Sequence, residues 1–190
     1  MLDVQGDVKE HEAALKRAAH TLGLKAQVVT VKNPKDIKAL HAIIIPGGES
    51  TTIGMLMKKY GMLEALREVS SEIPVFGTCA GMVMLAKEGG NMKDGQPLLN
   101  LMDARVIRNA YGRQRDSFEA DLNIPVLGRE MFHGVFIRAP ALERIWGRCK
   151  SLCVYDGRVV FARQDNLLAV AFHPELTDDT RVHEYFLEMI

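Results

Sequence analysis

Residues 75–81 of the 190-residue chain read Val-Phe-Gly-Thr-Cys-Ala-Gly, and they indicate the fold more directly than any other stretch. A short apolar run typical of a strand leads into a turn of small residues and then into a helical pattern. The turn has the form Gly-x-nucleophile-x-Gly, with Cys79 at its centre. Such a turn strains the central residue and exposes its thiol at a helix N-terminus, which favours the thiolate. The plainer alternative is that Cys79 is a small buried apolar residue.

The sequence around this turn alternates between strand and helix patterns. Residues 8–22 have helical spacing that stops at Gly23, and residues 51–69 have helical spacing interrupted at Gly61. Residues 80–87 form the next expected helix. The expected strands are residues 26–31, 42–45 and 75–77. Alternation of this kind predicts βαβ crossovers and a mostly parallel sheet.

The sequence after residue 95 has a different pattern. Asp156-Gly157 lies inside a β-rich stretch and indicates a tight hairpin, and residues 180–189 form a closing helix. The expected strands are residues 98–106, 117–122, 134–137, 152–162 and 167–172. We therefore expect one α/β domain over residues 1–190. It has a mostly parallel, doubly wound sheet flanked by helices, with an antiparallel extension.

Composition excludes several classes of function. The chain has 24 basic and 24 acidic residues, so it has no excess of positive charge with which to bind nucleic acid or an anionic membrane. The longest apolar stretches are far shorter than the roughly 20 residues that cross a bilayer, and the first residues lack a signal-peptide pattern. The three cysteines, Cys79, Cys149 and Cys153, are too few for a disulfide framework and do not have zinc-site spacing. We expect a cytoplasmic protein without a metal or cofactor, and with neither nucleic acid nor membrane as a partner.

Residues 172–176, Phe-His-Pro-Glu-Leu, supply a base for the thiol. They follow the last apolar run, so His173 lies at another strand end. Glu175, two residues later, can hydrogen-bond to the second ring nitrogen of His173. For an isolated His-Pro-Glu the alternative is a surface turn. The remaining histidines are weaker candidates: we expect His11, His20 and His183 on the solvent-facing sides of helices, His41 before a strand, and His133 in a loop as the only competitor.

A third strand end carries Pro-Gly-Gly-Glu-Ser-Thr-Thr at residues 46–52. Two glycines after a strand let backbone N–H groups turn inward, toward a phosphate or toward the oxyanion of an acyl-transfer intermediate. The stretch lacks Gly-Lys-Ser/Thr, and the acidic residue after the glycines would repel phosphate. An oxyanion hole from the N–H groups of Gly48 and Ala80 suits the chemistry better. The structural alternative, a turn with Ser50 or Thr51 as helix N-cap, is compatible with it.

Together these three motifs resemble the class I, triad-type glutamine amidotransferases. Two further stretches narrow the resemblance to the PdxT/SNO family, the glutaminase subunits of pyridoxal 5'-phosphate synthase. They are Arg-Asn-Ala-Tyr-Gly-Arg-Gln at residues 108–114, followed by Asp-Ser-Phe-Glu at 116–119, and Gly-Val-Phe-Ile-Arg-Ala-Pro at 134–140. The motifs occur in the family's order and cover nearly the whole chain.

The resemblance implies hydrolysis of L-glutamine to L-glutamate and ammonia. The ammonia would pass to a (β/α)8-barrel synthase subunit within a large hetero-oligomer. By motif matching, Cys79 is the nucleophile, and His173 and Glu175 complete the triad. The matching glutamine-binding positions are Gly47, Gly48, Glu49, Ser50, Arg108, Ile137 and Arg138. An arginine and a carboxylate also suit the charged groups of a free amino acid.

The family pattern further implies that the isolated glutaminase has low activity, because its oxyanion turn becomes competent only when the synthase docks. The start of this chain departs from the pattern. Only residues 1–4 precede Gln5-Gly6, so the first strand, near the expected interface, is short. Two rivals are a cysteine peptidase or related thiol protein on a similar fold, and a non-catalytic regulatory subunit. The Pro-Gly-Gly turn argues against the first, and the intact triad residues argue against the second.

Overall fold

The apolar runs form the centre of one mixed sheet in the computed structural model, which describes residues 1–6, 8–112 and 116–190. Of the sequence motifs, Arg113 and Gln114 lie outside the described residues. Three strands are buried along their whole length and pair in parallel: β1 (Ile43–Ile45), β2 (Val75–Thr78) and β10 (Leu167–Val170). Parallel strands covered on both faces need the nearly continuous apolar runs that these segments supply.

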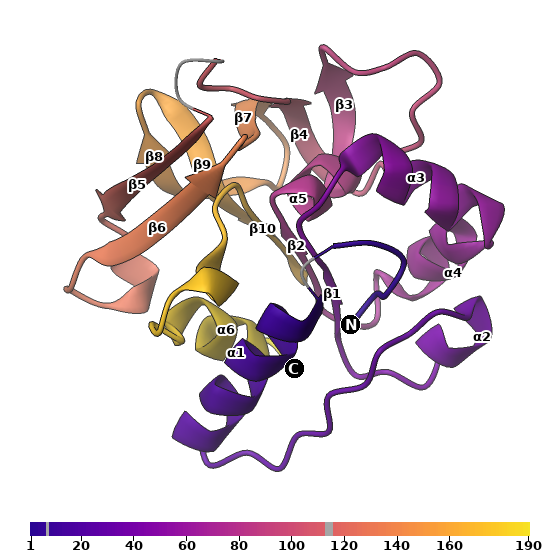
Figure 1. Cartoon of the computed structure of the whole chain (residues 1–190), viewed down its shortest axis with the longest axis horizontal. Helices are drawn as coiled ribbons and strands as arrows, with labels where there is room; N and C mark the ends of the chain where they lie inside the picture. Colours follow the sequence, from indigo (N-terminus) through magenta and orange to yellow (C-terminus); the bar gives the residue numbers. More distant parts are fainter. Residues whose placement is uncertain (7, 113–115) are drawn as a thin grey trace.

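Mostly antiparallel strands continue the sheet beyond β10, and only the last pair, β4 with β3, is parallel. The order across it is β1-β2-β10-β9-β7-β4-β3, and β8 pairs with β9 (Figure 1). These further strands are β3 (Ala86–Gly90), β4 (Met102–Ile107), β7 (Ala141–Ile145), β8 (Lys150–Tyr155) and β9 (Arg158–Gln164). A separate antiparallel pair consists of β5 (Ser117–Leu122) and β6 (Phe132–Ile137). The predicted α/β fold, with a parallel half and an antiparallel extension, is confirmed.

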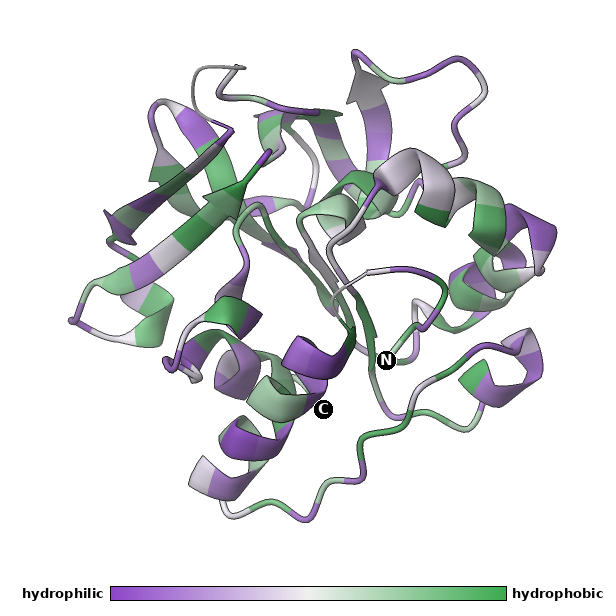
Figure 2. Ribbon diagram, viewed as in Figure 1, coloured by the Kyte–Doolittle hydropathy of each residue, from purple (hydrophilic) through white to green (hydrophobic). Residues whose placement is uncertain are grey.

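Helices cover both faces of the parallel strands (Figure 1). Phe76 of β2 points toward α1 and α6, where its ring contacts Phe186. A Cβ on the next residue, Gly77, would meet Gly81 and Leu85 of α5, so α5 lies on the opposite face. Figure 2 shows the apolar central strands between the helices. The helices are α1 (Val8–Thr21), α2 (Pro34–Ile37), α3 (Ser50–Lys59), α4 (Met62–Val69), α5 (Ala80–Leu85) and α6 (Arg181–Leu187), with short 3-10 helices η2 (Pro125–Leu127) and η3 (Pro174–Leu176). Across the described residues, every helix is too short or too polar to pass through a lipid bilayer.

Three predicted elements differ from the structure. The strand expected at residues 26–31 is only an isolated bridge from Val31 to Leu2, because residues 24–30 are mostly exposed at the sheet's edge. The helix expected to reach residue 87 ends at Leu85, and β3 begins at once with the poor helix formers Gly89-Gly90 at its end. The strand expected from residue 98 begins only at Met102. In addition, β7 has no counterpart among the predicted strands, because its buried residues are adjacent rather than alternate.

The first residues of the chain extend the parallel half of the sheet. The backbone N–H of Leu2 donates to Ile44 O over 2.9 Å, and the N–H of Val31 donates to Met1 O over 2.8 Å. Residues 1–3 thus lie between β1 and the segment that ends at Val31. The short first stretch is long enough to place Gln5 and Gly6 directly against the turn that follows β1.

The two glycines that flank Cys79 are required by close packing. A Cβ on Gly77 would come within 2.5 Å of the backbone carbonyl of Gly81. A Cβ on Gly81 would collide with the backbone carbonyl oxygen of Ile45 in β1. The strand-to-helix turn can therefore sit this close to β1 only with glycine at both positions.

We predict that Gly81→Ala destabilises the protein strongly, because backbone atoms of β1 cannot move away from the added methyl group. The free energy of unfolding from urea denaturation should fall by more than about 3 kcal/mol. Gly95→Ala is the matched control, since Gly95 has a positive φ of 71° but open space around its Cβ position. It should cost only about 1–2 kcal/mol of backbone strain. Equal losses in the two variants would contradict the packing argument.

Candidate active site

A cleft of about 310 Å³ opens where β1, β2 and β10 end. This volume is near the lower end of the roughly 300–1,000 Å³ typical of small-molecule sites. Predicted site residues make up most of its lining: Gly48, Glu49, Ser50, Cys79, Ala80, Arg108, Ile137, Arg138 and His173. The remaining lining residues are Gln5, Val83, Asn109 and Pro140. Within the described part of the chain, Gly47 and Glu175 do not line the cleft.

Cys79 lies at the N-terminus of α5 with the backbone of a strained turn. Its φ of 48° and ψ of −102° are rare for a residue with a side chain. Its N–H donates to Val170 O of β10 over 2.8 Å, which fixes the turn to the neighbouring strand. Cys79 is 8% exposed and its Sγ lies 3.9 Å from the carbonyl oxygen of Ile137, so the thiol faces the cleft between β2 and the end of β6.

His173 connects the cleft to a buried carboxylate. Its Nδ1 lies 2.7 Å from Glu175 Oε1, and both side chains are almost fully buried. Burial lowers the pKa of His173, but hydrogen bonds with Cys79 and Glu175 and the charges of both outweigh it and raise the pKa to about 10. With Nδ1 bonded to Glu175, Nε2 is the ring atom available to Cys79. At neutral pH the ring is therefore an imidazolium positioned to hold a thiolate or to give up a proton.

The predicted oxyanion turn is held from behind by the start of the chain. Gly48 has a φ of 144°, and a Cβ there would lie 2.7 Å from Gln5 Oε1. Gln5 Oε1 also accepts a hydrogen bond from the N–H of Glu49 over 3.0 Å. The N–H of Ala80 lies in the first turn of α5, where helix N–H groups have no acceptor within the helix. The structure thus brings Gly48 and Ala80 to the same cleft as Cys79.

Glu49 has a structural role that the sequence prediction assigned to its neighbours. It is the N-cap of α3: Oε2 accepts from the N–H of Thr52 over 2.7 Å and from its hydroxyl over 2.9 Å. The N-cap predicted at Ser50 or Thr51 is therefore wrong, because the helix already begins at Ser50. Burial raises the pKa of Glu49, but hydrogen bonds from Thr52 and Thr51 outweigh it and lower the pKa to about 2. Glu49 is thus a permanent negative charge at the cleft.

Arg108 lies opposite this charge, and its guanidinium group has three partners. Its Nη2 donates to Glu49 Oε1 over 3.1 Å, and its Nη1 lies 3.3 Å from both Thr51 Oγ1 and Gln96 Oε1. Gln96 also donates from Nε2 to Ser50 Oγ over 3.1 Å. Gln96 therefore orders two predicted glutamine-binding residues, although nothing in its local sequence indicates such a role.

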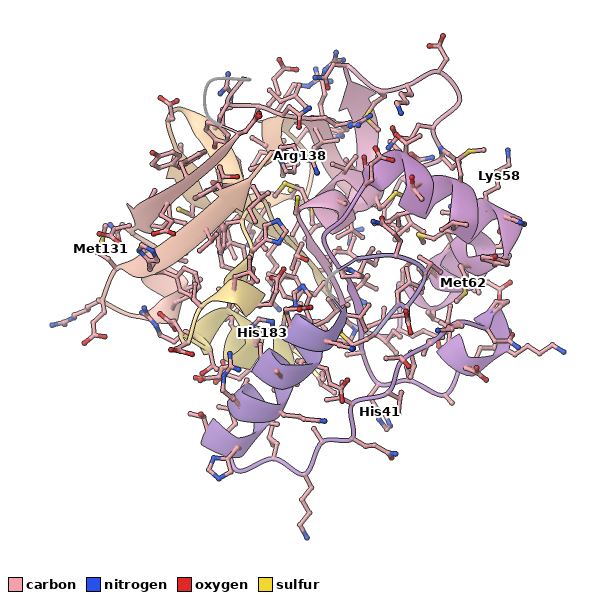
Figure 3. All side chains as sticks on the ribbon, in the orientation of Figure 1. His41, Lys58, Met62, Met131, Arg138 and His183 are labelled. Carbon is pink, nitrogen blue, oxygen red and sulfur yellow. The ribbon has the colours of Figure 1, made fainter. Side chains whose placement is uncertain are left out.

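The Ile137-Arg138 pair closes the cleft from the end of β6. Arg138 has a positive φ of 43°, and its N–H donates to Asp116 O over 2.5 Å. Figure 3 labels Arg138 at this strand end, and its side chain is largely exposed. The positive φ of Arg138 turns the chain sharply just after Ile137, whose carbonyl oxygen lies against Cys79 Sγ.

Three of the other five histidines do not lie where the sequence predicted, whereas His20 is exposed and His41 precedes β1, as expected. His11 and His183 are completely buried, so their prediction as solvent-facing is wrong: α1 and α6 pack on each other and enclose them. His133 is on β6 rather than in a loop, exposed between Glu119 and Asp121. It does not line the cleft formed by the described residues. Over residues 1–6, 8–112 and 116–190, no group of three or more His, Cys, Asp or Glu side chains is arranged to hold a metal ion.

Comparison with known proteins gives consistent results over the whole chain. The SNO glutamine amidotransferase family matches residues 1–190. The pyridoxal 5'-phosphate synthase subunit PdxT of Saccharolobus solfataricus is 50% identical, over 98% of this chain and 95% of that protein. The PdxT protein of Sulfolobus acidocaldarius is 47% identical over the same shares.

Solved structures agree with these relatives. A crystal structure described as a glutamine amidotransferase is 46% identical, covers 99% of this chain and 96% of its own, and superposes with a TM-score of 0.88. The structure of PurLQS from Thermotoga maritima covers 95% of this chain and 91% of its own. It is 13% identical with a TM-score of 0.60, which shows a shared fold alone.

The two buried histidines predict a specific pH dependence of stability. Burial, with the charge of Arg17, lowers the pKa of His183 to about 3, and burial also lowers the pKa of His11 well below its usual value. Both are neutral when folded but bind protons below about pH 6.5 when unfolded, so acid favours unfolding. His183→Leu should reduce the loss of unfolding free energy between pH 7 and pH 5 by about 2 kcal/mol.

The control is His20→Leu, which removes an exposed histidine of the same α1–α6 region. Its loss between the two pH values, measured by urea denaturation, should equal that of the wild type. If the unfolding free energy of His183→Leu fell between pH 7 and pH 5 as much as that of the wild type, His183 would have to be charged in the folded protein.

Proposed function

Because the chain belongs to the SNO glutamine amidotransferase family, we infer that it is the glutaminase subunit of a pyridoxal 5'-phosphate synthase. Relatives at 47–50% identity carry the name of that subunit along almost their full length. The observation that supports catalysis most strongly is the 2.7 Å bond from His173 to Glu175 behind a cleft that Cys79 lines. We propose that these residues act as the catalytic triad of a domain spanning residues 1–190.

In the first half of the reaction, the Cys79 thiolate attacks the side-chain amide carbon of L-glutamine. The carbonyl oxygen becomes an oxyanion, which accepts hydrogen bonds from the N–H groups of Gly48 and Ala80. The His173 imidazolium gives its Nε2 proton to the amide nitrogen, the C–N bond breaks, and ammonia leaves. The product on the enzyme is a γ-glutamyl thioester of Cys79.

In the second half, water hydrolyses this thioester. His173, now neutral, takes a proton from the water as its oxygen attacks the thioester carbon. The C–S bond then breaks, glutamate leaves, and the thiolate–imidazolium pair is restored. Glu175 keeps Nδ1 protonated throughout, which fixes the tautomer and stabilises the imidazolium in both halves.

The charges around the cleft suit the free amino-acid end of glutamine. Glu49 supplies a fixed negative charge for the α-ammonium group, and Arg138 supplies an accessible guanidinium for the α-carboxylate. Arg108 is already bonded to Glu49, so we propose that it orients that carboxylate and contributes to the carboxylate site from there. Ser50 and Ile137 complete the lining of the proposed glutamine site, and we propose that Gly47 acts through the same turn as Gly48.

The ammonia, we propose, passes to a partner synthase subunit with a (β/α)8-barrel in a large hetero-oligomer. Release into solvent would waste glutamine, so docking is expected to control turnover. Contact of Gln5 and Gly6 with the turn at Gly47-Gly48 supports control through the start of the chain. A cytoplasmic location fits this role and the cysteines, none of which forms a disulfide in the described structure.

Replacing the nucleophile should abolish hydrolysis. Glutamate release from L-glutamine by Cys79→Ala should fall by about 10,000-fold or more, because no thioester can form. Far-UV circular dichroism and binding to the cognate synthase subunit should be unchanged. The assay is run with and without that subunit, and wild-type activity should depend on its presence. Turnover near the wild-type rate in the variant would exclude Cys79 as the nucleophile.

Arg138→Ala should weaken glutamine binding without removing the chemistry. Loss of one charge-assisted hydrogen bond predicts a rise in KM for glutamine of roughly tenfold, equivalent to about 1.4 kcal/mol, with a much smaller change in kcat. Arg148→Ala is the control, since Arg148 is exposed and pairs with Asp165 away from the cleft. An unchanged KM in Arg138→Ala would remove Arg138 from the glutamine site.

A further inference from the structure

A buried histidine lies directly behind the carboxylate of the proposed triad. His11 comes from α1, and the side chains around it come from three other elements: Thr78 from β2, Glu175 from η3 and His183 from α6. His11, Thr78 and His183 are completely buried, and Glu175 is 5% exposed. Figure 3 labels His183 where α6 meets α1. The proposed triad reaction has no step that uses His11.

The distances make His11 part of a continuous line of polar contacts. His173 Nδ1 lies 2.7 Å from Glu175 Oε1, and His11 Nε2 lies 3.3 Å from the other oxygen, Oε2. His11 Nε2 is also 2.9 Å from Thr78 Oγ1. On its far side, His11 Nδ1 lies 3.1 Å from His183 Nε2. The two oxygens of Glu175 thus face two different histidines.

These contacts determine the tautomer of His11. A carboxylate oxygen can only accept, so a lone pair on Nε2 would face another lone pair at 3.3 Å. Nε2 therefore carries the hydrogen, which it donates to Thr78 Oγ1, and the positive end of this N–H group lies beside Glu175 Oε2. Nδ1 then accepts from the Nε2–H of His183, whose own Nδ1 has no hydrogen-bond partner among the described residues. Each ring in the line has one donor and one acceptor, as neutral imidazoles require.

Electrostatics keep His11 neutral. Burial, together with the charges of His183, His173 and the N-terminal amine, lowers the pKa of His11 well below its usual value. Its contact with Glu175 is therefore between an N–H dipole and a carboxylate rather than an ion pair. The imidazolium of His173, rather than His11, faces Glu175 as a cation.

We propose that His11 is a positioning residue for the triad, which holds Oε2 of Glu175 so that Oε1 stays aligned with His173 Nδ1. The inference rests on the proposed function of Cys79, His173 and Glu175. A carboxylate with a partner on one oxygen only can rotate about its last bond, whereas one fixed at both oxygens cannot. His183 contributes because its N–H binds Nδ1 of His11 and so keeps the hydrogen of His11 on Nε2.

A matched pair of variants separates this role from packing. The side-chain amide of asparagine ends where Nδ1 of histidine lies, and that of glutamine reaches as far as Nε2. His11→Asn therefore keeps a partner for His183 but loses the donor facing Glu175, whereas His11→Gln keeps that donor. Phe186→Leu is the packing control, because Phe186 lies in the same layer against Phe76 and has no part in the proposed chemistry.

Two measurements are made on each variant. Glutamine hydrolysis in the complex with the cognate synthase subunit gives kcat and KM. Alkylation of the isolated chain by iodoacetamide at pH 6, followed by mass spectrometry at Cys79, reports the thiolate–imidazolium pair without any turnover. Cys149 and Cys153 provide little background, because burial raises the pKa of each thiol to about 11.

His11→Asn should lower both kcat and the alkylation rate of Cys79 by about 10- to 100-fold, by analogy with the range found when hydrogen-bond partners that orient metal-ligating residues are removed. KM for glutamine should stay within about twofold, because His11 does not touch the substrate. His11→Gln should remain within about threefold of the wild type in both measurements, and Phe186→Leu likewise.

Wild-type rates in His11→Asn would overturn the inference, and so would equal losses in His11→Asn, His11→Gln and Phe186→Leu. Failure of the proposed function has a different signature: a wild-type complex that does not hydrolyse glutamine. In that case the alkylation rates still decide whether His11 positions Glu175.

Discussion

The parallel register of three short strands is the constraint on which the site depends. Ile45 of β1 pairs with Gly77 of β2, which pairs in turn with Ala169 of β10. Because the strands run in the same direction, the Pro-Gly-Gly turn, Cys79 and His173 all emerge at one edge of the sheet. A slip of one residue would turn every side chain to the opposite face. Glycines at 77 and 81 allow α5 to approach β1 closely enough for the three loops to share one cleft.

Charge is distributed unequally around this cleft, and the difference fits the two tasks of binding and catalysis. On one side Glu49 and Arg108 form an ion pair that is partly open to solvent, so a charged substrate can exchange with water there. On the other side Glu175 is buried, where an unpaired carboxylate would cost several kcal/mol. Hydrogen bonds with Cys79 and Glu175, and the charges of both, raise the pKa of His173 despite its burial, so His173 stays protonated and compensates that charge. The interaction that allows Glu175 to be buried is thus the same one that prepares His173 to act on Cys79.

The sequence predicted the parts of the molecule that follow from local patterns. The strained turn at Cys79, the last apolar strand before His173 and the hairpin at Asp156-Gly157 are each encoded by neighbouring residues. The burial of His11 and His183 was not predicted. Each lies on the mostly apolar face of its helix, but helical spacing alone does not reveal that these two faces, from opposite ends of the chain, pack together. The role of Gln96 could not be predicted for the same reason, because its partners Ser50 and Arg108 are not its neighbours in the sequence.

A glutamine site at Cys79 is tested by labelling with a glutamine-analogue electrophile, a diazo ketone of the glutamine side chain, in the complex with the synthase subunit. Peptide mass spectrometry then locates the adduct. We expect one adduct, on Cys79, formed at a rate that L-glutamine reduces by competition and that Arg138→Ala also reduces. Labelling of Cys149 or Cys153 instead, or labelling of Cys79 that glutamine does not slow, would contradict a glutamine site at this cleft.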